Sequence, residues 1–262
     1  MEALKVNGLI IREINIGDSD KLITVLTDTM GKITVSCKGV RNIKSKRIAA
    51  SQLFSYGELL LNVRASRYYL ADAAVENSFF ELNSSLEKLS LAQYFCQVVS
   101  CVTVENEDQS EILRLILNCF YVLCHQNKSP ELVKAVFEMR LCALIGFCPD
   151  LFECMGCACE ILPDCPGGVY LDIGNGSVIC QSCAASDENS EQSQASYLYL
   201  TPHIYSALRF IVTAPAKKIF SFSFSNDKQI EKELSDITEK YLRYHLDRGF
   251  ETLDFYHSIQ GF

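Results

Sequence analysis

Residues 8–38 read GLIIREINIGDSDKLITVLTDTMGKITVSCK and contain three short apolar runs separated by compact polar stretches. In the third run, Ile33, Val35 and Cys37 alternate with polar residues, so we expect one buried face and one hydrated face. Residues 28–31 read DTMG, a composition typical of a tight turn. The stretch therefore predicts three consecutive β-strands joined by short turns.

The pattern continues beyond this stretch. GELLLNVR (57–64) and YYLADAAVE (68–76) form a further pair of predicted strands across the short link 65–67. Five short strands in about 75 residues indicate a small closed or nearly closed barrel, because closure removes exposed strand edges. We predict that this barrel occupies residues 1–78.

The periodicity becomes helical near Phe79. Ser129 and Pro130 suit the start of one helix, and Gly146 suits its end. Helices of this length joined by short links favour antiparallel packing. Residues 186–196 are polar and low in complexity, which predicts a mobile loop. The predicted helices cover residues 84–102, 110–126, 129–149, 201–214 and 227–250.

Composition limits the class of protein. The chain has 262 residues, of which 48% are hydrophobic and 21% charged, as in soluble globular proteins. No apolar run reaches about 18 residues and the N-terminus lacks a signal-peptide pattern, so we expect a cytoplasmic protein with reduced thiols. The 13 cysteines are then no disulfide framework. Five of them are expected to be small buried hydrophobic residues of the helices: Cys96, Cys101, Cys119, Cys124 and Cys142.

Charge divides the chain into two parts. Residues 1–78 hold 11 lysines and arginines against 8 acidic residues, a net charge of +3, whereas residues 79–262 hold 13 against 24, a net charge of −11. This asymmetry suggests an anionic partner for the first part and a different kind of partner for the second.

Two Cys-x-x-Cys pairs lie in residues 154–183, CMGCACEILPDCPGGVYLDIGNGSVICQSC. A tight turn directs both sulfurs of such a pair at one ion, and four thiolates are a common ligand set for structural zinc. The segment between the pairs predicts a hairpin that turns at 174–176. A segment of about 30 residues buries too little apolar surface to be stable alone, and a metal replaces the missing core. The predicted zinc ligands are Cys154, Cys157, Cys180 and Cys183.

Other interpretations of the cysteine segment remain open. A thioredoxin-like redox pair normally belongs to a βαβ unit, which the pattern does not show. Iron accepts the same four sulfurs as zinc. The ligand register is also open, since Cys148, Cys159 and Cys165 are close in sequence; we take these three as spectator thiols. No histidine or carboxylate stands at hydrolase spacing, so we expect a structural site and not a catalytic one.

The ten residues KGVRNIKSKR (38–47) carry five positive charges and no acid. Proteins hold single-stranded nucleic acid with a basic groove and aromatic side chains that stack on bases. Phe54, Tyr56, Tyr68 and Tyr69 are candidates for stacking, although filling the barrel core is the simpler role for each. The run of charges also suits a plain hydrated surface. The candidate DNA-binding residues are Lys32, Lys38, Arg41, Lys44, Lys46, Arg47, Arg64 and Arg67.

The sequence contains no enzyme signature that we recognise. Gly31-Lys32 lacks the earlier glycine and the following serine or threonine of a phosphate-binding loop. The four histidines are scattered, without an H-E-x-x-H motif. We therefore predict no catalytic residues.

Three stretches together resemble the bacterial recombination-mediator family RecO: GDSDKLITVLTDTMGKITVSCKGVR (17–41), FEMRLCALIGFCPDLFECMGC (137–157) and YLRYHLDRGF (241–250). The resemblance covers essentially the whole chain. It implies an α+β protein with an N-terminal five-stranded OB-fold barrel (1–78), a helical domain (79–149 and 197–262) and a zinc-ribbon-like insertion (150–185), with 186–196 as a polar loop.

The resemblance also implies a function. RecO-like proteins bind single- and double-stranded DNA, anneal complementary strands, and help load the RecA recombinase together with RecR and single-stranded-DNA-binding protein. They are cytoplasmic and associate with the nucleoid. The resemblance places the DNA role on Lys38, Arg41, Lys44, Lys46 and Arg47, and one structural zinc on the four cysteines. The alternative, suggested by the acidic residues 79–262, is a zinc-stabilised interaction adaptor that does not bind DNA.

Overall fold

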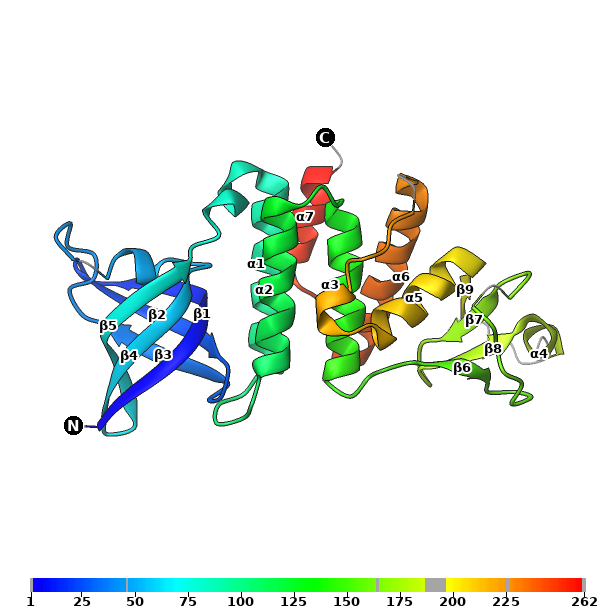
Figure 1. The fold of residues 1–262 in the computed structure, drawn as a ribbon, viewed down its shortest axis with the longest axis horizontal. Helices are drawn as coiled ribbons and strands as arrows, with labels where there is room; N and C mark the ends of the chain where they lie inside the picture. Colours follow the sequence, from blue (N-terminus) through cyan, green and yellow to red (C-terminus); the bar gives the residue numbers. More distant parts are fainter. Residues whose placement is uncertain (1, 46, 164, 187–196, 225–226, 261–262) are drawn as a thin grey trace. The chain divides into compact units, whose positions relative to one another are not determined.

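A computed structural model describes residues 2–45, 47–163, 165–186, 197–224 and 227–260 (Figure 1). The chain forms two compact units, one of Met1–Asn127 with Phe250–Phe262 and the other of Lys128–Gly249. Each unit is described on its own. The predicted polar loop 186–196 lies outside the described residues except for Ser186, and the predicted domain boundaries stay a prediction.

The first unit contains the predicted barrel, which closes in the strand order β1-β2-β3-β5-β4, consistent with an OB-fold (Figure 1). All neighbours pair antiparallel except β3 and β5, which pair in parallel with Val35 opposite Tyr68. The strands are β1 (Glu2–Ile16), β2 (Asp20–Thr27), β3 (Lys32–Cys37), β4 (Tyr56–Arg64) and β5 (Arg67–Asn77).

The barrel core follows the predicted alternation. Ile33, Val35 and Cys37 are buried, and they join a cluster with apolar residues of the other four strands. The first strand begins six residues earlier than the pattern indicated, because residues 2–7 pair with β4. Barrel closure therefore uses a segment whose sequence alone gave no clear strand signal.

Helices complete the first unit. They are α1 (Leu86–Val102), α2 (Ser110–His125) and α7 (Glu251–Gln260), with a short 3-10 helix η2 (Phe80–Ser84) before α1. Phe54 meets Phe120 of α2 edge to face at 5.3 Å between ring centroids, so Phe54 is a core residue and not a free stacking platform. The helix α7 was not predicted; it follows Phe250, whose ring packs on Tyr94 at 5.6 Å.

The barrel packs closely against the α1–α2 connection at one glycine. Gly31 has a φ of +64°, and a Cβ there would lie 1.9 Å from the carbonyl oxygen of Val104. The same carbonyl accepts a hydrogen bond from the backbone N–H of Lys32 at 3.0 Å. Only glycine permits this close approach, so the turn before β3 also docks the barrel on its own helices.

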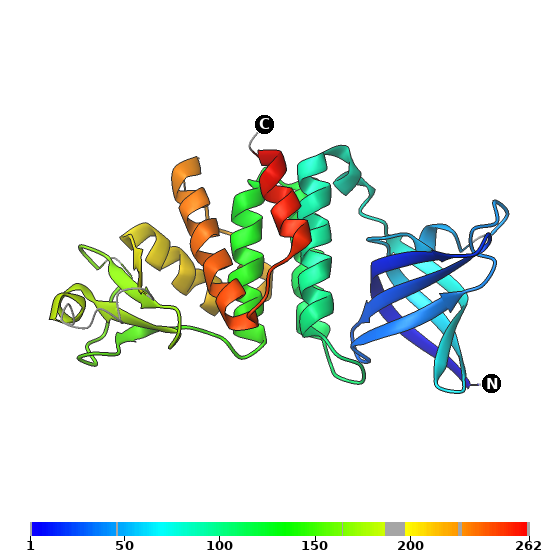
Figure 2. The ribbon, with the colours of Figure 1, turned by 180° about the vertical axis from the view of Figure 1, so that it is seen from behind.

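The second unit combines helices α3 (Pro130–Leu144), α5 (Pro202–Thr213) and α6 (Lys228–Leu246) with a four-stranded sheet (Figure 2). As predicted, the hydroxyl of Ser129 caps α3 by accepting from Leu132 N, and Gly146 follows its end with a φ of +95°. The sheet has the order β6-β8-β7-β9: β6 (Asp150–Cys154), β7 (Val169–Asp172), β8 (Ser177–Cys180) and β9 (Tyr197–Leu200). No described helix is long and apolar enough to cross a membrane.

A buried ion-pair network joins α3 to α6. Lys134 Nζ lies 3.1 Å from Glu138 Oε1 and 2.8 Å from Glu239 Oε2, and both Lys134 and Glu138 are fully buried. The hydroxyl of Thr238 donates to Glu138 at 2.8 Å. Burying a charge is costly unless it is paired and hydrogen-bonded, and these contacts meet that condition.

The helical cysteines are only partly where the sequence placed them. Cys96, Cys119 and Cys142 are buried, and burial raises the pKa of each thiol. Cys124 is half-buried, and the prediction is wrong for Cys101, which is exposed near the end of α1. The apolar stripe of α1 does not include position 101.

Candidate nucleic-acid interface and metal centre

The basic loop, residues 38–47, leaves the end of β3 and folds over the β1–β2 turn. Asp20 anchors its first residues: one carboxylate oxygen accepts from Gly39 N at 2.8 Å, and the other lies 2.7 Å from Lys38 Nζ. The backbone donor of Gly39 and the Lys38 ammonium lower the pKa of Asp20, and the hydrogen bond with Asp20 raises that of Lys38. Lys38 is thus an exposed cation that already has an anionic partner.

The middle of the basic loop is held by main-chain contacts. Arg41 N donates to Ser19 O at 2.9 Å, and the Arg41 guanidinium donates to Gly17 O at 2.8 Å. The backbone N–H of Ser45 donates to Asn42 O at 2.8 Å and closes a tight turn. Lys44, a central residue of that turn, is exposed. The loop is therefore fixed to the barrel while its tip faces solvent.

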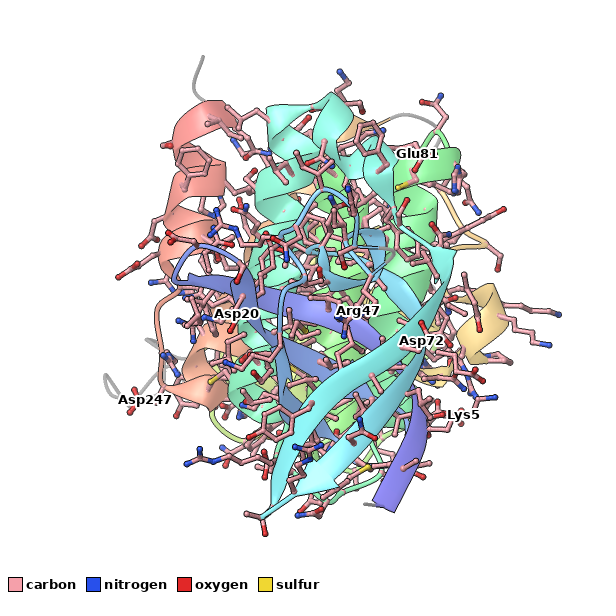
Figure 3. All side chains as sticks on the ribbon, turned by 90° about the vertical axis from the view of Figure 1, so that its left-hand side faces the viewer. Lys5, Asp20, Arg47, Asp72, Glu81 and Asp247 are labelled. Carbon is pink, nitrogen blue, oxygen red and sulfur yellow. The ribbon has the colours of Figure 1, made fainter. Side chains whose placement is uncertain are left out.

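Arg47 anchors the other end of the basic loop. Its guanidinium donates to Leu70 O at 2.7 Å and to Lys38 O at 3.0 Å, which ties the loop both to β5 and to its own beginning. Figure 3 looks onto the barrel and labels Arg47 with Asp20 and Asp72. The geometry gives Arg47 a positioning role in addition to its charge.

The basic loop borders a hollow of about 600 Å³ on the barrel surface. Its lining combines the cations Lys44 and Arg47 with one acid, Asp72, and with small or polar residues. A hollow of this volume with cations on its rim can accept a sugar–phosphate or a base. The remaining lining residues are Gly39, Asn42, Ser45 and Ala71.

The structure brings together only part of the predicted basic set. Lys32 donates to the carbonyl oxygen of Ser100, so its ammonium faces the helices of its unit. Arg64 and Arg67 face each other across the β4–β5 hairpin and do not line the hollow. Lys46 lies outside the described residues. The residues gathered at the loop are therefore Lys38, Arg41, Lys44 and Arg47.

The candidate stacking residues also separate. Tyr68 packs against the barrel core, as the simpler role predicted. Tyr69 is half-buried and precedes Leu70, whose carbonyl oxygen accepts a hydrogen bond from Arg47 of the loop. Tyr69 is therefore the aromatic residue best placed beside the basic loop.

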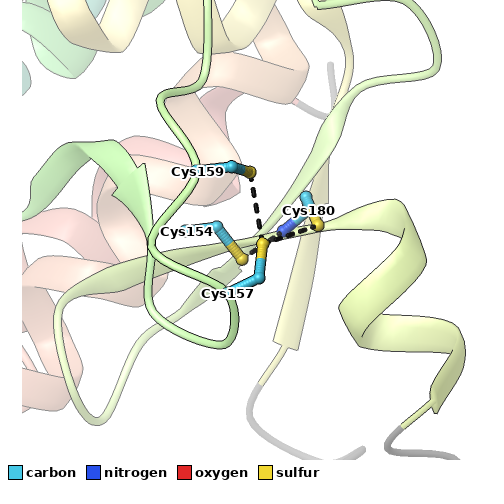
Figure 4. A group of neighbouring side chains, drawn as sticks. All are labelled: Cys154, Cys157, Cys159 and Cys180. Carbon is cyan, nitrogen blue, oxygen red and sulfur yellow. Dashed lines mark hydrogen bonds between the residues drawn. The ribbon is translucent and has the colours of Figure 1, made fainter.

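The cysteines gather at one end of the second unit's sheet (Figure 4). Cys154 ends β6, Cys180 ends β8, and Cys183 lies on the short helix α4 (Gln181–Ser186) that follows. The sulfurs of Cys154, Cys157, Cys159 and Cys180 all lie within 4.8 Å of one another, so this group could hold a metal ion.

Backbone groups prepare Cys154 to act as a thiolate. Burial raises its pKa, but hydrogen bonds from the backbone N–H groups of Cys180, Cys157 and Gly156 outweigh this and lower the pKa to about 6. The donor from Cys180 lies 3.2 Å from the sulfur. Turns that direct N–H groups at a cysteine sulfur favour the ionised form, which is the form that binds metal.

Cys183, the remaining predicted ligand, is not one of these four residues but lies next to them: a Cβ on Gly156 would be 3.0 Å from its sulfur and 3.8 Å from that of Cys154. The thiol of Cys183 interacts with those of Cys157 and Cys180, whose proximity raises the pKa of Cys183. The pKa of Cys159 is raised to about 12, mainly by its hydrogen bond with Cys157. Sulfurs this close cannot all ionise unless a cation compensates their charge, so the donor set fits a divalent metal.

One distance disfavours Cys159 as the fourth ligand beside Cys154, Cys157 and Cys180. Four sulfurs that lie 2.3 Å from a tetrahedral ion are about 3.8 Å from each other. Cys157 and Cys180 are 3.9 Å apart, which fits, whereas Cys157 and Cys159 are 3.2 Å apart, which is too close for two such ligands. We expected Cys159 to be a spectator thiol. The Cys-x-Cys spacing of Cys157 and Cys159 was the signal that the Cys159 sulfur would lie close to the predicted ligands. Cys148 and Cys165 lie outside the cluster of sulfurs.

Comparison with known proteins identifies the family. Residues 1–79 match the family model "Recombination protein O N terminal" and residues 83–254 match "Recombination protein O C terminal". The chain is similar to proteins named DNA repair protein RecO from Acetivibrio thermocellus (29% identity, 97% of this chain and 96% of that one) and Symbiobacterium thermophilum (30%, 72% and 75%). A third, from Caldicellulosiruptor bescii, is 26% identical over 99% of this chain and 100% of its own. The chain therefore belongs to the RecO family of DNA repair proteins.

Proposed function

We propose that this protein binds single- and double-stranded DNA through the basic loop of its barrel and promotes annealing of complementary strands. The observation that carries the proposal is the fixed loop, which presents Lys44 and Arg47 beside a surface hollow in an otherwise acidic protein. Membership of a DNA repair family supports the same ligand.

Annealing requires no residue that makes or breaks a covalent bond, so the proposed protein is a mediator and not an enzyme. Cations that bind two strands reduce the repulsion between their phosphates and raise their local concentration. In this proposal the protein acts with RecR and with single-stranded-DNA-binding protein to load RecA, in the cytoplasm at the nucleoid. The acidic residues 79–262, net charge −11, suit contacts with proteins better than contacts with DNA.

The proposal is tested with the full chain, since the barrel packs on α2 through Phe54 and Phe120. Retardation of a single-stranded oligonucleotide and the rate of annealing with its complement are measured at low salt. We expect Lys44→Ala/Lys46→Ala to lower both. Lys5→Ala is the matched control, because Lys5 is an exposed barrel cation on β1 paired with Glu58 and away from the loop. Absence of retardation by the native chain would favour the adaptor without DNA binding.

For the cysteine cluster we propose one structural zinc held by Cys154, Cys157, Cys180 and Cys183. The 3.9 Å separation of Cys157 and Cys180 and the N–H groups directed at Cys154 support three of these ligands, and the 3.2 Å separation of Cys157 and Cys159 favours Cys183 over Cys159 as the fourth. Bound zinc would compensate the charge of the thiolates and stabilise the small sheet.

The zinc proposal is tested by metal analysis of purified protein. We expect about one zinc per chain in the native protein and in Cys159→Ser, and a loss of zinc in Cys183→Ser. The opposite pattern would make Cys159 the fourth ligand. If the analysis finds iron and not zinc, the proposed metal is wrong but the proposed ligand residues still stand.

A further inference from the structure

Ile43 is the most exposed large apolar side chain among the described residues, at 97%. It lies in the tip of the basic loop, between Asn42 and Lys44. The hydrogen bond from Ser45 N to Asn42 O makes Ile43 and Lys44 the two central residues of a four-residue turn. The isoleucine therefore projects from the outermost point of the loop.

Isoleucine is unusual at this position. Single exposed apolar residues are ordinary on protein surfaces, but the centres of tight turns favour glycine, asparagine, aspartate, serine and proline. A β-branched residue has no conformational advantage there and leaves its apolar surface in water. A bound partner that covers Ile43 would remove this cost.

The turn is fixed before any partner binds. The backbone N–H and the guanidinium of Arg41 hold its first side to the β1–β2 turn at 2.9 and 2.8 Å. Arg47 holds the other side to β5 at 2.7 Å. A side chain whose backbone is already ordered loses little further entropy on binding. Ile43 can therefore contact a partner at a small entropic cost.

The charges next to Ile43 indicate the chemistry of the partner. Arg41 lies two residues before it and Lys44 directly after it, and Lys44 and Arg47 line the neighbouring hollow. A nucleic acid strand offers phosphates to the cations and flat apolar base faces to the isoleucine within one short segment. Isoleucine is among the apolar residues that proteins insert between base steps.

A membrane surface fits these observations less well. Anionic headgroups would also attract the cations, but stable anchoring needs a large apolar area or a second signal. Burial of one isoleucine contributes only about 1.5 to 3 kcal/mol of binding free energy. Asp20 and Asp72 also lie beside the same loop and would repel anionic headgroups.

We propose that Ile43 inserts between neighbouring bases of the DNA strand that the basic loop binds. This inference rests on the proposed function and adds a contact with bases to a contact with phosphates. Insertion unstacks the step that it enters and splays those bases apart, while their unpaired Watson–Crick edges stay accessible. An annealing protein would in this way present bases to the incoming complementary strand.

The test uses the full chain and a single-stranded oligonucleotide that contains 2-aminopurine, whose fluorescence rises when the base is unstacked. Binding is followed separately by anisotropy over a range of salt concentrations. We expect Ile43→Ser to lose at least half of the fluorescence rise at saturation and to lower affinity about ten- to hundredfold. Its salt slope should equal that of the native chain, because no charge has changed.

Two variants serve as controls. Ile43→Leu keeps the apolar volume and should keep the fluorescence rise. Leu60→Ser removes another exposed apolar side chain, on the outer face of β4, and should change neither signal. If the native chain binds the oligonucleotide but Ile43→Ser gives the same fluorescence rise, the proposed insertion of Ile43 is wrong and the proposed function stands. If the native chain fails to bind, both are wrong. If Ile43→Ser instead loses binding to phosphatidylglycerol vesicles, the loop is a membrane contact.

Discussion

The carboxylate of Asp20 lies 2.7 Å from the ammonium of Lys38 and also accepts the backbone N–H of Gly39 at 2.8 Å. One acid thus anchors the start of the basic loop and occupies one of its cations. Asp20 competes with DNA phosphate for Lys38 while holding the loop in position. The two roles can be separated by substitution.

Asp20→Asn should strengthen DNA binding. The amide oxygen can still accept from Gly39 N, but it cannot neutralise Lys38, which becomes available for a phosphate. We expect affinity at low salt to rise about twofold and the slope of log affinity against log salt to steepen by about 0.7. Fluorescence anisotropy with a single-stranded oligonucleotide measures both. Asp20→Ala removes the anchor as well, so a gain in affinity equal to that of Asp20→Asn would contradict the anchoring role.

The same carboxylate predicts a dependence of stability on pH. Asp20 has a lowered pKa in the folded protein, chiefly through the Gly39 backbone donor and then Lys38. Its contribution is therefore complete above the unfolded pKa of about 4 and is lost as the pH falls below that value. Urea unfolding midpoints of the native chain and Asp20→Asn should differ at pH 7 and converge as the pH falls through the lowered pKa of Asp20. A constant difference over this range would show that the ionised carboxylate contributes nothing.

Arg47→Lys should loosen the basic loop while keeping its charge. A lysine cannot reproduce the two separate donations to Leu70 O and Lys38 O. We expect the unit that contains the barrel to lose about 1 kcal/mol in urea unfolding, and DNA affinity to fall without a change in salt slope. Arg67→Lys, at the exposed β4–β5 hairpin, should be neutral in stability. Equal effects of the two variants would remove the positioning role of Arg47.

Breaking the buried network of the second unit should be costly. Lys134→Met leaves the buried Glu138 without its cation and leaves Glu239 with Arg243 alone, which should cost about 3 to 5 kcal/mol of unfolding free energy. Lys134→Met/Glu138→Leu should recover part of this loss, because the buried carboxylate is gone. Lys232→Met, on the exposed side of α6, is the control. If Lys134→Met were as stable as the native chain, Lys134 would not form the buried ion pairs described.

Gly156→Ala should weaken metal binding. A Cβ at this position would lie 3.0 Å from both the Cβ and the sulfur of Cys183, so the two ligand-bearing turns would be pushed apart. Overpacking of about 1 to 3 kcal/mol corresponds to a loss of zinc affinity of about five- to 150-fold, measured in competition with a chromophoric chelator. Gly249→Ala, where the nearest atom would be 3.8 Å away, should bind zinc normally. Unchanged affinity in Gly156→Ala would argue against Cys183 as a ligand.

The sequence predicted the elements whose pattern is local. The alternation of apolar and polar residues in 32–37 and the residues at the two ends of α3, Ser129 and Gly146, can be recognised from a few adjacent positions in the sequence. The hairpin of β7 and β8 was expected for the same reason, from its central glycines. The two Cys-x-x-Cys pairs marked the cluster because a metal site constrains spacing along the chain.

What the sequence could not predict depends on contacts between distant residues. The beginning of β1 is a strand because β4 lies beside it, and α7 exists as a helix packed on α1. The presence of Cys159 in the sulfur cluster depends on how the turn after β6 folds. The charge run 38–47 likewise gave no indication that Lys38 is paired with Asp20 or that Arg47 holds the backbone of β5.

The central claim is that the basic loop binds the phosphates of DNA, and the salt dependence of affinity tests it most directly. The full chain, Lys44→Ala and the control Lys5→Ala are titrated with an oligonucleotide of about 20 nucleotides, longer than the site of one barrel. We predict that Lys44→Ala makes the slope of log affinity against log salt shallower by about 0.7, while Lys5→Ala keeps the native slope. Equal slopes for all three proteins, or no binding by the native chain in dilute buffer, would contradict the account.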